Sequence, residues 1–321
     1  MSTRKKVFDY IKERQRVTVG ELVDNFNISR WAIYKHLNSL TKEDKITKTG
    51  KPPRVFYLVK KDEKERDFTI DEKDKKIIEE NYLIITPSGE RKEGVEGFAY
   101  WCNKNNLDAS KVADEYVKTF EKYNSYKKNG VINGNEKLQN TFGDVFLDDI
   151  YYLDFYSIER FGKTKLGQLL LYGKQSGNKK IIKEIIEIIK PKVEKIIKTH
   201  KIDAIGFIPW TVKREVQIMR ELEKGMKIAT GKIKIEKIKT EITVPQKTLN
   251  KLGDRIENAE KTIVLTENVR YKNILLIDDA VGSGATMNET ARQIKDKKIA
   301  KKVVGIAITG SFKGFDVISE V

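Results

Sequence analysis

The sequence has few of the side chains that bind transition metals or form disulfides. Its 321 residues include one cysteine, Cys102, and two histidines, His36 and His200. A single thiol excludes a disulfide framework and a cysteine-based zinc site. Two histidines far apart in the chain offer little for a transition-metal cluster or a histidine-based catalytic triad. We therefore expect Cys102 to be a core or half-buried thiol.

Long hydrophobic runs are also missing. No stretch approaches the roughly 18 apolar residues that indicate a membrane-spanning helix, and no signal-peptide pattern precedes the first predicted helix. We therefore expect a cytoplasmic protein without a membrane partner.

Positive charge, by contrast, is in excess. The chain has 63 Lys and Arg against 47 Asp and Glu, a formal net charge of +16. An excess of this size favours a polyanionic partner such as nucleic acid, although a generally lysine-rich composition would produce it too. The length suggests two or three domains.

The most informative stretch is 273–290, with the sequence NILLIDDAVGSGATMNET. Its four apolar residues, Ile274 to Ile277, are typical of a buried parallel strand. Asp278 and Asp279 follow the strand. Next come a turn with two glycines among small hydroxyl residues and the start of a helix at 287–294. The predicted order is strand, acidic pair, anion-binding loop and helix.

A loop of this composition is suited to a phosphate. Gly282 and Gly284 tolerate positive φ and let backbone N–H groups turn inward, while Ser283 and Thr286 add hydroxyl donors. The loop also opens a helix N-terminus, which attracts anions. Two carboxylates would repel a phosphate unless the ligand also carried a diol or a metal ion, and a ribose 5-phosphate fits that description.

Two common nucleotide motifs are excluded by the same residues. A Walker A loop needs a lysine after its last glycine, and none follows Gly284. A dinucleotide fingerprint places its acidic residue after the glycines, whereas Asp278 and Asp279 precede them. The remaining alternative is an ordinary strand-to-helix turn capped by an aspartate.

The stretch resembles the phosphoribosyl-pyrophosphate (PRPP) signature of type I phosphoribosyltransferases, whose hydroxyl, glycine and hydroxyl positions are here Ser283, Gly284 and Thr286. The resemblance implies that Asp278 and Asp279 are catalytic and face the ribose hydroxyls. It also implies that Mg2+ is held through PRPP, with no direct protein ligand. The loop residues implied to bind the 5-phosphate of PRPP are Ala280, Val281, Gly282, Ser283, Gly284, Ala285 and Thr286.

From about residue 151 onward, strands alternate with helices, which predicts an α/β domain with a parallel sheet over 151–321. This half of the chain resembles the ComF-like type I phosphoribosyltransferases. In that group a basic residue early in the domain lies near the pyrophosphate of PRPP, and Lys174 has this place; a surface lysine at a helix end is the alternative. Arg214, in the segment after the predicted strand 203–209, is a further implied PRPP-binding residue.

Three more features of this half come from the same resemblance. Lys247 and Arg255 fall in a basic loop that is implied to be catalytic, because it would close over pyrophosphate and exclude water. Phe312 and Phe315 are implied to bind the base, with terminal packing as the alternative. The segment 210–217 lacks the glycine, phenylalanine and asparagine of the group, which is a departure on the acceptor side.

Residues 1–60 predict a different module. Amphipathic helices at 4–14, 17–26 and 30–40 precede two short strands, and Ser29 is a good N-cap for the third helix. This arrangement resembles a winged helix-turn-helix, whose third helix enters the DNA major groove while the hairpin contacts the backbone; a protein-docking module is the alternative. The implied nucleic-acid-binding residues are Arg30, Tyr34, Lys35, Lys48, Lys51 and Arg54.

Two segments join these modules. Residues 61–76 are dense in charge and predict a linker or a solvated helix. Residues 77–150 predict an α+β middle segment of unknown role, with a strand near 82–85 and helices at 97–103 and 109–123. The aromatic residues of these helices recur at helical spacing, so we expect them to pack in a core.

Together these features predict a nucleic-acid-associated phosphoribosyltransferase that binds PRPP with Mg2+ and transfers or exchanges a group at ribose C1. One alternative is a PRPP-sensing, DNA-binding transcriptional regulator without turnover. Another is an effector of a bacterial antiphage system of the retron kind, with a DNA or DNA–RNA partner. The implied basic loop favours the enzyme, whereas the altered 210–217 segment favours the regulator. A homodimer and a subunit of a defence complex are both open.

Overall fold

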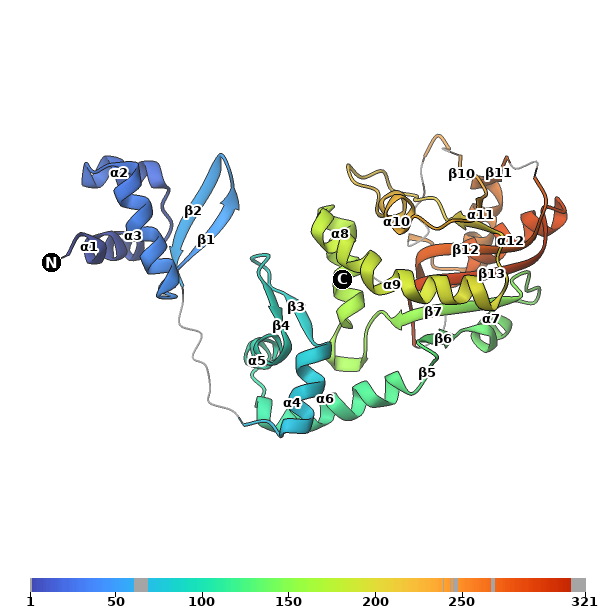
Figure 1. The fold of residues 1–321 in the computed structure, drawn as a ribbon, viewed down its shortest axis with the longest axis horizontal. Coiled ribbons are helices and arrows are strands. Elements are labelled where there is room, and N and C mark those ends of the chain that lie inside the picture. The colour runs from blue at the N-terminus through green and yellow to red at the C-terminus, as the bar shows by residue number, and fades with distance from the viewer. Residues whose placement is uncertain are drawn as a thin grey trace. The chain divides into compact units, whose positions relative to one another are not determined.

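The computed structural model of the chain describes residues 2–60, 69–238, 240–242, 244, 248–266 and 269–312. Two compact units are formed (Figure 1). The first comprises Met1–Phe68 with Pro87–Gly89, and the second comprises Thr69–Thr86 with Glu90–Val321. Apart from 87–89, the predicted middle segment and the predicted 151–321 domain therefore belong to one unit.

The first unit consists of three helices and a hairpin. Helices α1 (Thr3–Arg14), α2 (Val19–Phe26) and α3 (Arg30–Lys42) precede the antiparallel strands β1 (Ile46–Lys51) and β2 (Arg54–Val59). The third helix begins where the sequence predicts, because the Ser29 hydroxyl accepts a hydrogen bond from the Ala32 backbone N–H at 3.2 Å. The core of the unit contains Val7, Ile11, Val17, Leu22, Ile33, Leu37, Leu40, Ile46 and Tyr57.

A backbone bridge fastens the hairpin to the helices. Val17, between α1 and α2, donates to the Tyr57 carbonyl at 3.0 Å, and the Tyr57 N–H donates back to the Val17 carbonyl at 2.8 Å. The bridge and the shared core hold β1 and β2 in a fixed position against the helices.

The second unit is built around a seven-stranded sheet in the order β5-β6-β7-β13-β12-β8-β9. The pairs among β7, β13, β12, β8 and β9 are parallel, and those of β5 with β6 and β6 with β7 are antiparallel. The strands are β5 (Lys127–Lys128), β6 (Val131–Asn133), β7 (Asp149–Phe155), β8 (Ala204–Phe207), β9 (Gly231–Lys232), β12 (Tyr271–Val281) and β13 (Ala300–Gly310). The predicted α/β class with a largely parallel sheet is confirmed, and the sheet also takes in two strands of the predicted middle segment.

Helices and two small hairpins complete this unit. The hairpins are β3 (Leu83–Ile85) with β4 (Arg91–Glu93), and β10 (Ile235–Lys237) with β11 (Ile263–Leu265). A short 3-10 helix spans Glu159–Phe161. The helices are α4 (Glu72–Asn81), α5 (Gly94–Lys104), α6 (Ala109–Asn124), α7 (Asn135–Thr141), α8 (Lys165–Ser176), α9 (Lys179–Thr199), α10 (Ile218–Met226), α11 (Leu252–Thr262) and α12 (Ala285–Asp296).

Strand alternation sends the apolar residues of β12 to the two faces of the sheet. Leu275 and Ile277 join a core formed by the buried faces of α8, α9 and α10, and Ile274 and Leu276 are buried on the opposite side. The sequence predicts that the strand ends at Ile277, but β12 continues to Val281. The reason is that β13 runs beside it to its end and pairs with 280 and 281.

The aromatic residues of α5 and α6 pack as expected. Tyr82, Phe98 and Tyr116 are buried, with ring centroids 5.4 Å apart in each of their pairs. Cys102 is a buried thiol beside them, and burial raises the pKa of this thiol to about 12. Tyr116 also packs on Phe161 of the short 3-10 helix, with ring centroids 5.3 Å apart, so this segment packs against the chain that follows β7.

The region around Arg255 differs from the sequence prediction. A basic loop was expected there, but Arg255 lies in helix α11 and its side chain is only 5% exposed. The physical reason is the spacing of Leu252, Arg255, Ala259 and Thr262, which places these residues on one buried helical face. Lys247 lies outside the described residues.

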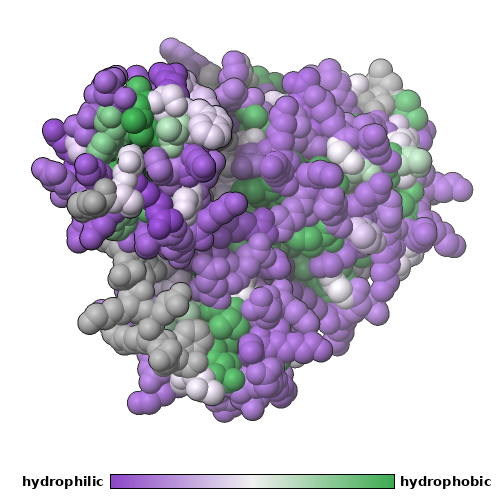
Figure 2. Space-filling view, turned by 60° about the vertical axis from the view of Figure 1, so that its left-hand side comes forward, coloured by the Kyte–Doolittle hydropathy of each residue, from purple (hydrophilic) through white to green (hydrophobic). Residues whose placement is uncertain are grey.

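The surface agrees with the charged composition. Hydrophilic residues cover most of the face seen in Figure 2, and apolar residues form small separate patches on it. Within the described residues, no helix combines the length and the apolar character that crossing a membrane requires.

Candidate functional site

One cavity of the second unit lies at the carboxyl edge of the parallel sheet. Its volume is about 240 Å³, and its walls come from residues that follow β7, β8 and β12, together with α8, α10 and α11. In parallel α/β sheets this edge is where ligands bind, because loops and helix N-termini converge there. The predicted site residues that line the cavity are Lys174, Arg214, Arg255, Asp278, Asp279, Ala280, Val281, Gly282, Ser283, Gly284, Ala285 and Thr286.

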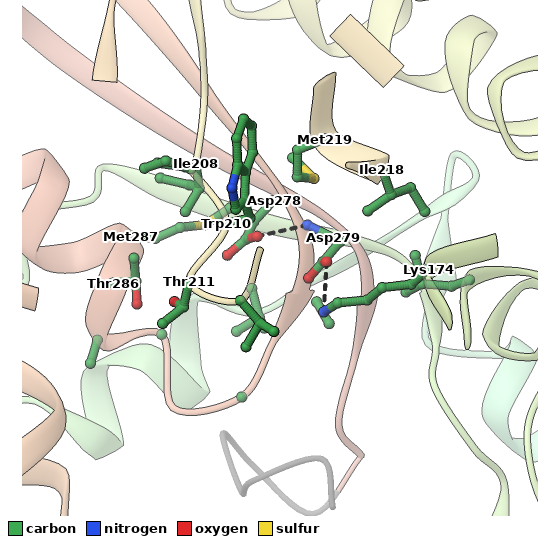
Figure 3. A pocket seen from close by; sticks show the side chains of 18 of the residues that line it. Lys174, Ile208, Trp210, Thr211, Ile218, Met219, Asp278, Asp279, Thr286 and Met287 are labelled. Atoms are coloured by element: carbon green, nitrogen blue, oxygen red, sulfur yellow. Dashed lines mark hydrogen bonds and ion pairs between the residues drawn. The ribbon is translucent and has the colours of Figure 1, made fainter. Parts of the chain in front are cut away.

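The two aspartates at the end of β12 have different partners. The Lys174 Nζ, from the last turn of α8, lies 2.8 Å from the Asp279 Oδ2, and the backbone N–H of Asp279 donates to the Asp278 Oδ1 at 2.7 Å. Figure 3 shows both contacts as dashed lines at the centre of the site. Lys174 is thus held against the acidic pair and is not an isolated surface lysine.

Asp278 is the more perturbed of the two. It opens into the cavity on one side, and protein atoms surround its carboxyl group on the others. Burial is the main cause that raises the pKa of Asp278 well above its usual range, and the charge of Asp279 adds to it. The Asp279 backbone hydrogen bond, Lys174 and Lys237 act in the opposite direction. Asp278 is therefore harder to ionise than an exposed aspartate.

The loop after β12 leads into a helix N-terminus whose N-cap residue is a glycine. Gly284 is the N-cap of α12, with φ of 83°, a left-handed conformation that favours glycine. The Ser283 hydroxyl accepts from the Ala285 N–H at 3.3 Å. The positive end of the α12 dipole and the hydroxyl of Thr286 both border the cavity, which gives it an anion-binding end.

The wall opposite this loop combines apolar residues with Thr211, Arg214 and Gln217. It is formed by the segment after β8 and the start of α10, and Trp210 is 43% exposed within it. In Figure 3 the indole stands beside Asp278, with Ile208 and Met219 on either side. Sequence analysis did not select Trp210, although its place directly after a predicted parallel strand is a signal that could have identified it.

Arg255 meets the cavity from α11. Its Nε donates to the Leu249 carbonyl at 2.7 Å, and burial lowers the pKa of the guanidinium. The side chain is thus anchored to the backbone of the segment that precedes α11. Its predicted role at pyrophosphate stays a prediction.

Of the two phenylalanines predicted to bind a base, Phe312 is not brought into the site. Phe312 packs on Tyr123, Tyr126 and Phe155, with ring centroids 4.4, 5.4 and 5.4 Å away, and it is not part of the cavity lining. This packing is the terminal alternative considered for the sequence. Phe315 lies outside the described residues.

The predicted nucleic-acid face belongs to the first unit. Arg30, Tyr34 and Lys35 of α3 are exposed, as are Lys48 and Arg54 of the hairpin; Lys51 is in β1, but its side chain lies outside the described residues. Trp31 is 74% exposed, and the Lys35 Nζ lies 5.6 Å from its ring centroid. A large aromatic group flanked by cations on one helix face is suited to nucleic acid.

Neither a metal-binding cluster among the described residues nor a sequence relative indicates the function of the protein. Within the described residues, no group of three or more His, Cys, Asp or Glu is placed to hold a metal ion. No protein-family model matches the chain, and no curated protein matches it in sequence. The function must therefore be inferred from the geometry of the cavity and of the first unit.

Proposed function

We propose that the second unit is a type I phosphoribosyltransferase-like domain that binds PRPP with Mg2+ and transfers or exchanges a group at ribose C1. One observation carries the proposal. An acidic pair at the end of a central parallel strand borders the cavity. The N-terminus of α12, which has a glycine N-cap and follows a loop of glycine and hydroxyl residues, borders the same cavity. A ribose with a 5-phosphate offers hydroxyl donors to the first and a dianion to the second.

Different residues of the cavity would bind different parts of PRPP. Asp278 and Asp279 accept hydrogen bonds from the ribose hydroxyls, and the backbone and hydroxyls of 280–286 hold the 5-phosphate. Lys174 and Arg214, both in the cavity wall, are the cations for the diphosphate. The negative charge of Asp278 and Asp279 is compatible with a metal ion that arrives bound to the diphosphate. Such an ion would neutralise part of the negative charge of the diphosphate.

The reaction would proceed by substitution at C1. The bond from C1 to the pyrophosphate oxygen breaks, its electron pair leaves with pyrophosphate, and the nucleophile forms the new bond to C1. Positive charge develops on the sugar and negative charge on the leaving group. The chain contributes by positioning the ribose and by placing Lys174 and Arg214 where the negative charge appears.

The first unit supports a nucleic-acid partner. We propose that it acts as a winged helix-turn-helix, with α3 in the major groove and β1 and β2 as the wing. The exposed Arg30, Tyr34 and Lys35 are on the groove-facing side of α3, and Lys48 and Arg54 are on the hairpin. The net charge of +16 favours contact with phosphates.

A second candidate function is a PRPP sensor that regulates DNA binding without turnover. The observation in its favour is the wall after β8. Trp210 and Val212, both exposed, occupy a segment where pyrophosphate binding in a phosphoribosyltransferase would need donors. These exposed apolar residues lie beside Arg214 and leave fewer donors for a departing dianion, which favours a sensor over an enzyme.

Incubation of the full chain with labelled PRPP and Mg2+, with and without nucleobases or nucleic acid, tests the proposal. We expect release of pyrophosphate by wild type and a roughly thirtyfold lower rate in Asp279→Asn, because the variant gives up a charge-assisted hydrogen bond to the ribose that contributes about 2 kcal/mol. The matched control is Asp296→Asn, at the exposed C-terminal end of α12. Tight PRPP binding without turnover would favour the sensor, and no binding at all would refute both.

A further inference from the structure

Strand β10 places a lysine, Lys237, on its inward-facing side, where strand alternation predicts an apolar residue. Ile233 and Ile235 point towards Gly206 of β8, and Lys234 and Glu236 point outward, where they form an ion pair at 2.8 Å. By strand alternation 237 faces inward and 238 outward. Lys237 is half-buried and Ile238 is 51% exposed, which inverts the usual distribution of polar and apolar residues.

The inversion is not a local irregularity of the backbone. Lys237 pairs with Ile263 in the β10–β11 ladder, and the Ile238 N–H donates to the Thr262 carbonyl at 2.7 Å. The position is therefore fixed, and a buried ammonium group at a fixed position costs desolvation energy. Where a local rule is broken in this way, a functional role is the usual reason.

The end of the Lys237 side chain reaches the wall of the cavity. Its Nζ donates to the Thr211 hydroxyl at 2.9 Å, and Thr211 lines the cavity directly after Trp210. Burial lowers the pKa of Lys237, and the charge of Asp278 opposes this effect. In turn, Lys237 is one of the cations that oppose the raised pKa of Asp278.

We propose that Lys237 is a positioning residue of the cavity, which holds Thr211 in the cavity wall and brings a positive charge to the side of the site where Asp278 accepts ribose hydroxyls. The inference rests on the ribose-phosphate site proposed above. Neither the PRPP-like motif nor the order of residues in the chain indicates this role, because only the packing of the hairpin against the sheet brings Lys237 to the cavity wall.

The charged groups that act on Asp278 come from three elements. Asp279 of β12 favours the protonated form, and Lys174 of α8 and Lys237 of β10 favour the ionised form. Lys174 is itself paired with Asp279, so Lys237 is not simply replaceable by it. Removal of the Lys237 charge therefore makes Asp278 harder to ionise.

A direct test is carbon-13 NMR titration of the aspartate carboxyls in the full chain, with Asp278 assigned through Asp278→Asn. We expect Asp278 to titrate at higher pH in Lys237→Met and in Lys237→Gln than in wild type, and near the wild-type pH in Lys237→Arg. The Lys237→Gln side chain still has a hydrogen-bond donor for Thr211 but no charge. This variant therefore isolates the effect of the charge, and it replaces Lys237→Met if the methionine variant does not fold. Lys234→Met, at the exposed outward position, is the matched control and should leave the titration unchanged. An unchanged titration in both charge-removing variants would overturn the proposal.

A binding measurement separates this inference from the proposed function. With ribose 5-phosphate as the probe at weakly acidic pH, we expect binding to Lys237→Gln on the order of tenfold weaker than to wild type, since one pKa unit corresponds to a factor of ten in the ionised fraction. The difference should shrink at alkaline pH. Wild-type binding with no effect of the variant at any pH would reject the role of Lys237 and leave the site standing. If wild type binds neither ribose 5-phosphate nor PRPP, the proposed function fails, and the NMR titration still decides whether Lys237 controls Asp278.

Discussion

The two aspartates of the cavity differ because they face different charges. Asp279 is directly paired with Lys174 at 2.8 Å. Asp278 is surrounded by protein, and this burial, with a smaller contribution from the charge of Asp279, raises its pKa. Asp279 is therefore the carboxylate of an ion pair, and Asp278 is the one whose ionisation is opposed by burial.

This difference predicts how pH changes ligand binding. Ribose hydroxyls donate hydrogen bonds to a carboxylate, so a bound ribose favours the ionised form of Asp278. Below the raised pKa the free protein holds a proton there, and binding releases it. We expect ribose 5-phosphate to bind more tightly as the pH rises through the pKa of Asp278. The proton release can be measured by calorimetry in buffers of different ionisation enthalpy.

The control for this prediction is Asp278→Asn, which has no proton to release at that position. Because the phosphate of the ligand also titrates, the quantity to compare is the difference in proton release between the two proteins. If wild type and variant released the same number of protons across the neutral range, Asp278 would not be in contact with the sugar.

At the scale of elements, the site depends on how β12 is joined to α12. The joint needs a left-handed residue at Gly284, with φ of 83°. Any residue with a Cβ is strained in that conformation, by about 1 kcal/mol or more. A side chain there would also disturb the backbone N–H groups at the start of α12.

We therefore expect Gly284→Ala to lower the free energy of unfolding by about 1 kcal/mol and to weaken binding of ribose 5-phosphate. The matched control is Gly253→Ala in α11, where φ is not positive and an added Cβ would meet nothing within 4 Å. That variant should be neutral or slightly stabilised, because alanine favours the helix. Urea unfolding and calorimetric titration measure the two effects. Equal stability of both variants would show that the joint is not strained.

The elements also show what could be predicted from the sequence. The acidic pair and the loop are contiguous in the chain, so their meeting in one cavity follows from one strand-to-helix connection. The apolar run from Ile274 to Ile277 predicted the strand, and Ser29 predicted the start of α3. These features depend on local spacing and capping, which the sequence displays directly.

Other parts of the site could not be predicted because they depend on tertiary packing. Lys237 looks like one of many lysines in a lysine-rich stretch, and only the hairpin geometry brings it to Thr211. Phe312 was expected at a base, but three aromatic rings from α6, the turn after it and β7 hold it elsewhere. Arg255 differs from these two residues. The helical spacing around it is visible in the sequence, but the resemblance to the ComF-like group implied a loop there.

At the scale of the whole molecule, the chain combines a unit suited to nucleic acid with a unit suited to a sugar phosphate. Each has its own core, so each can form its site without the other. The net charge of +16 predicts that binding to nucleic acid weakens steeply with salt. Because each unit has its own core, the fold itself does not require coupling between the two sites.

Because the two units have separate cores, the enzyme and the sensor predict different effects of DNA on PRPP affinity. An enzyme that uses nucleic acid only as an anchor should bind PRPP equally well, within about a factor of two, with and without duplex DNA, because no coupling free energy is needed. A sensor requires coupling, and linkage makes it reciprocal, so PRPP must change DNA affinity by the factor by which DNA changes PRPP affinity. For the enzyme, which we favour, we expect the two affinities to be independent. Titrations of the full chain with each ligand in the presence of the other, at one fixed salt concentration, measure both factors. Equal factors well above two, abolished in Asp279→Asn, would instead establish the sensor.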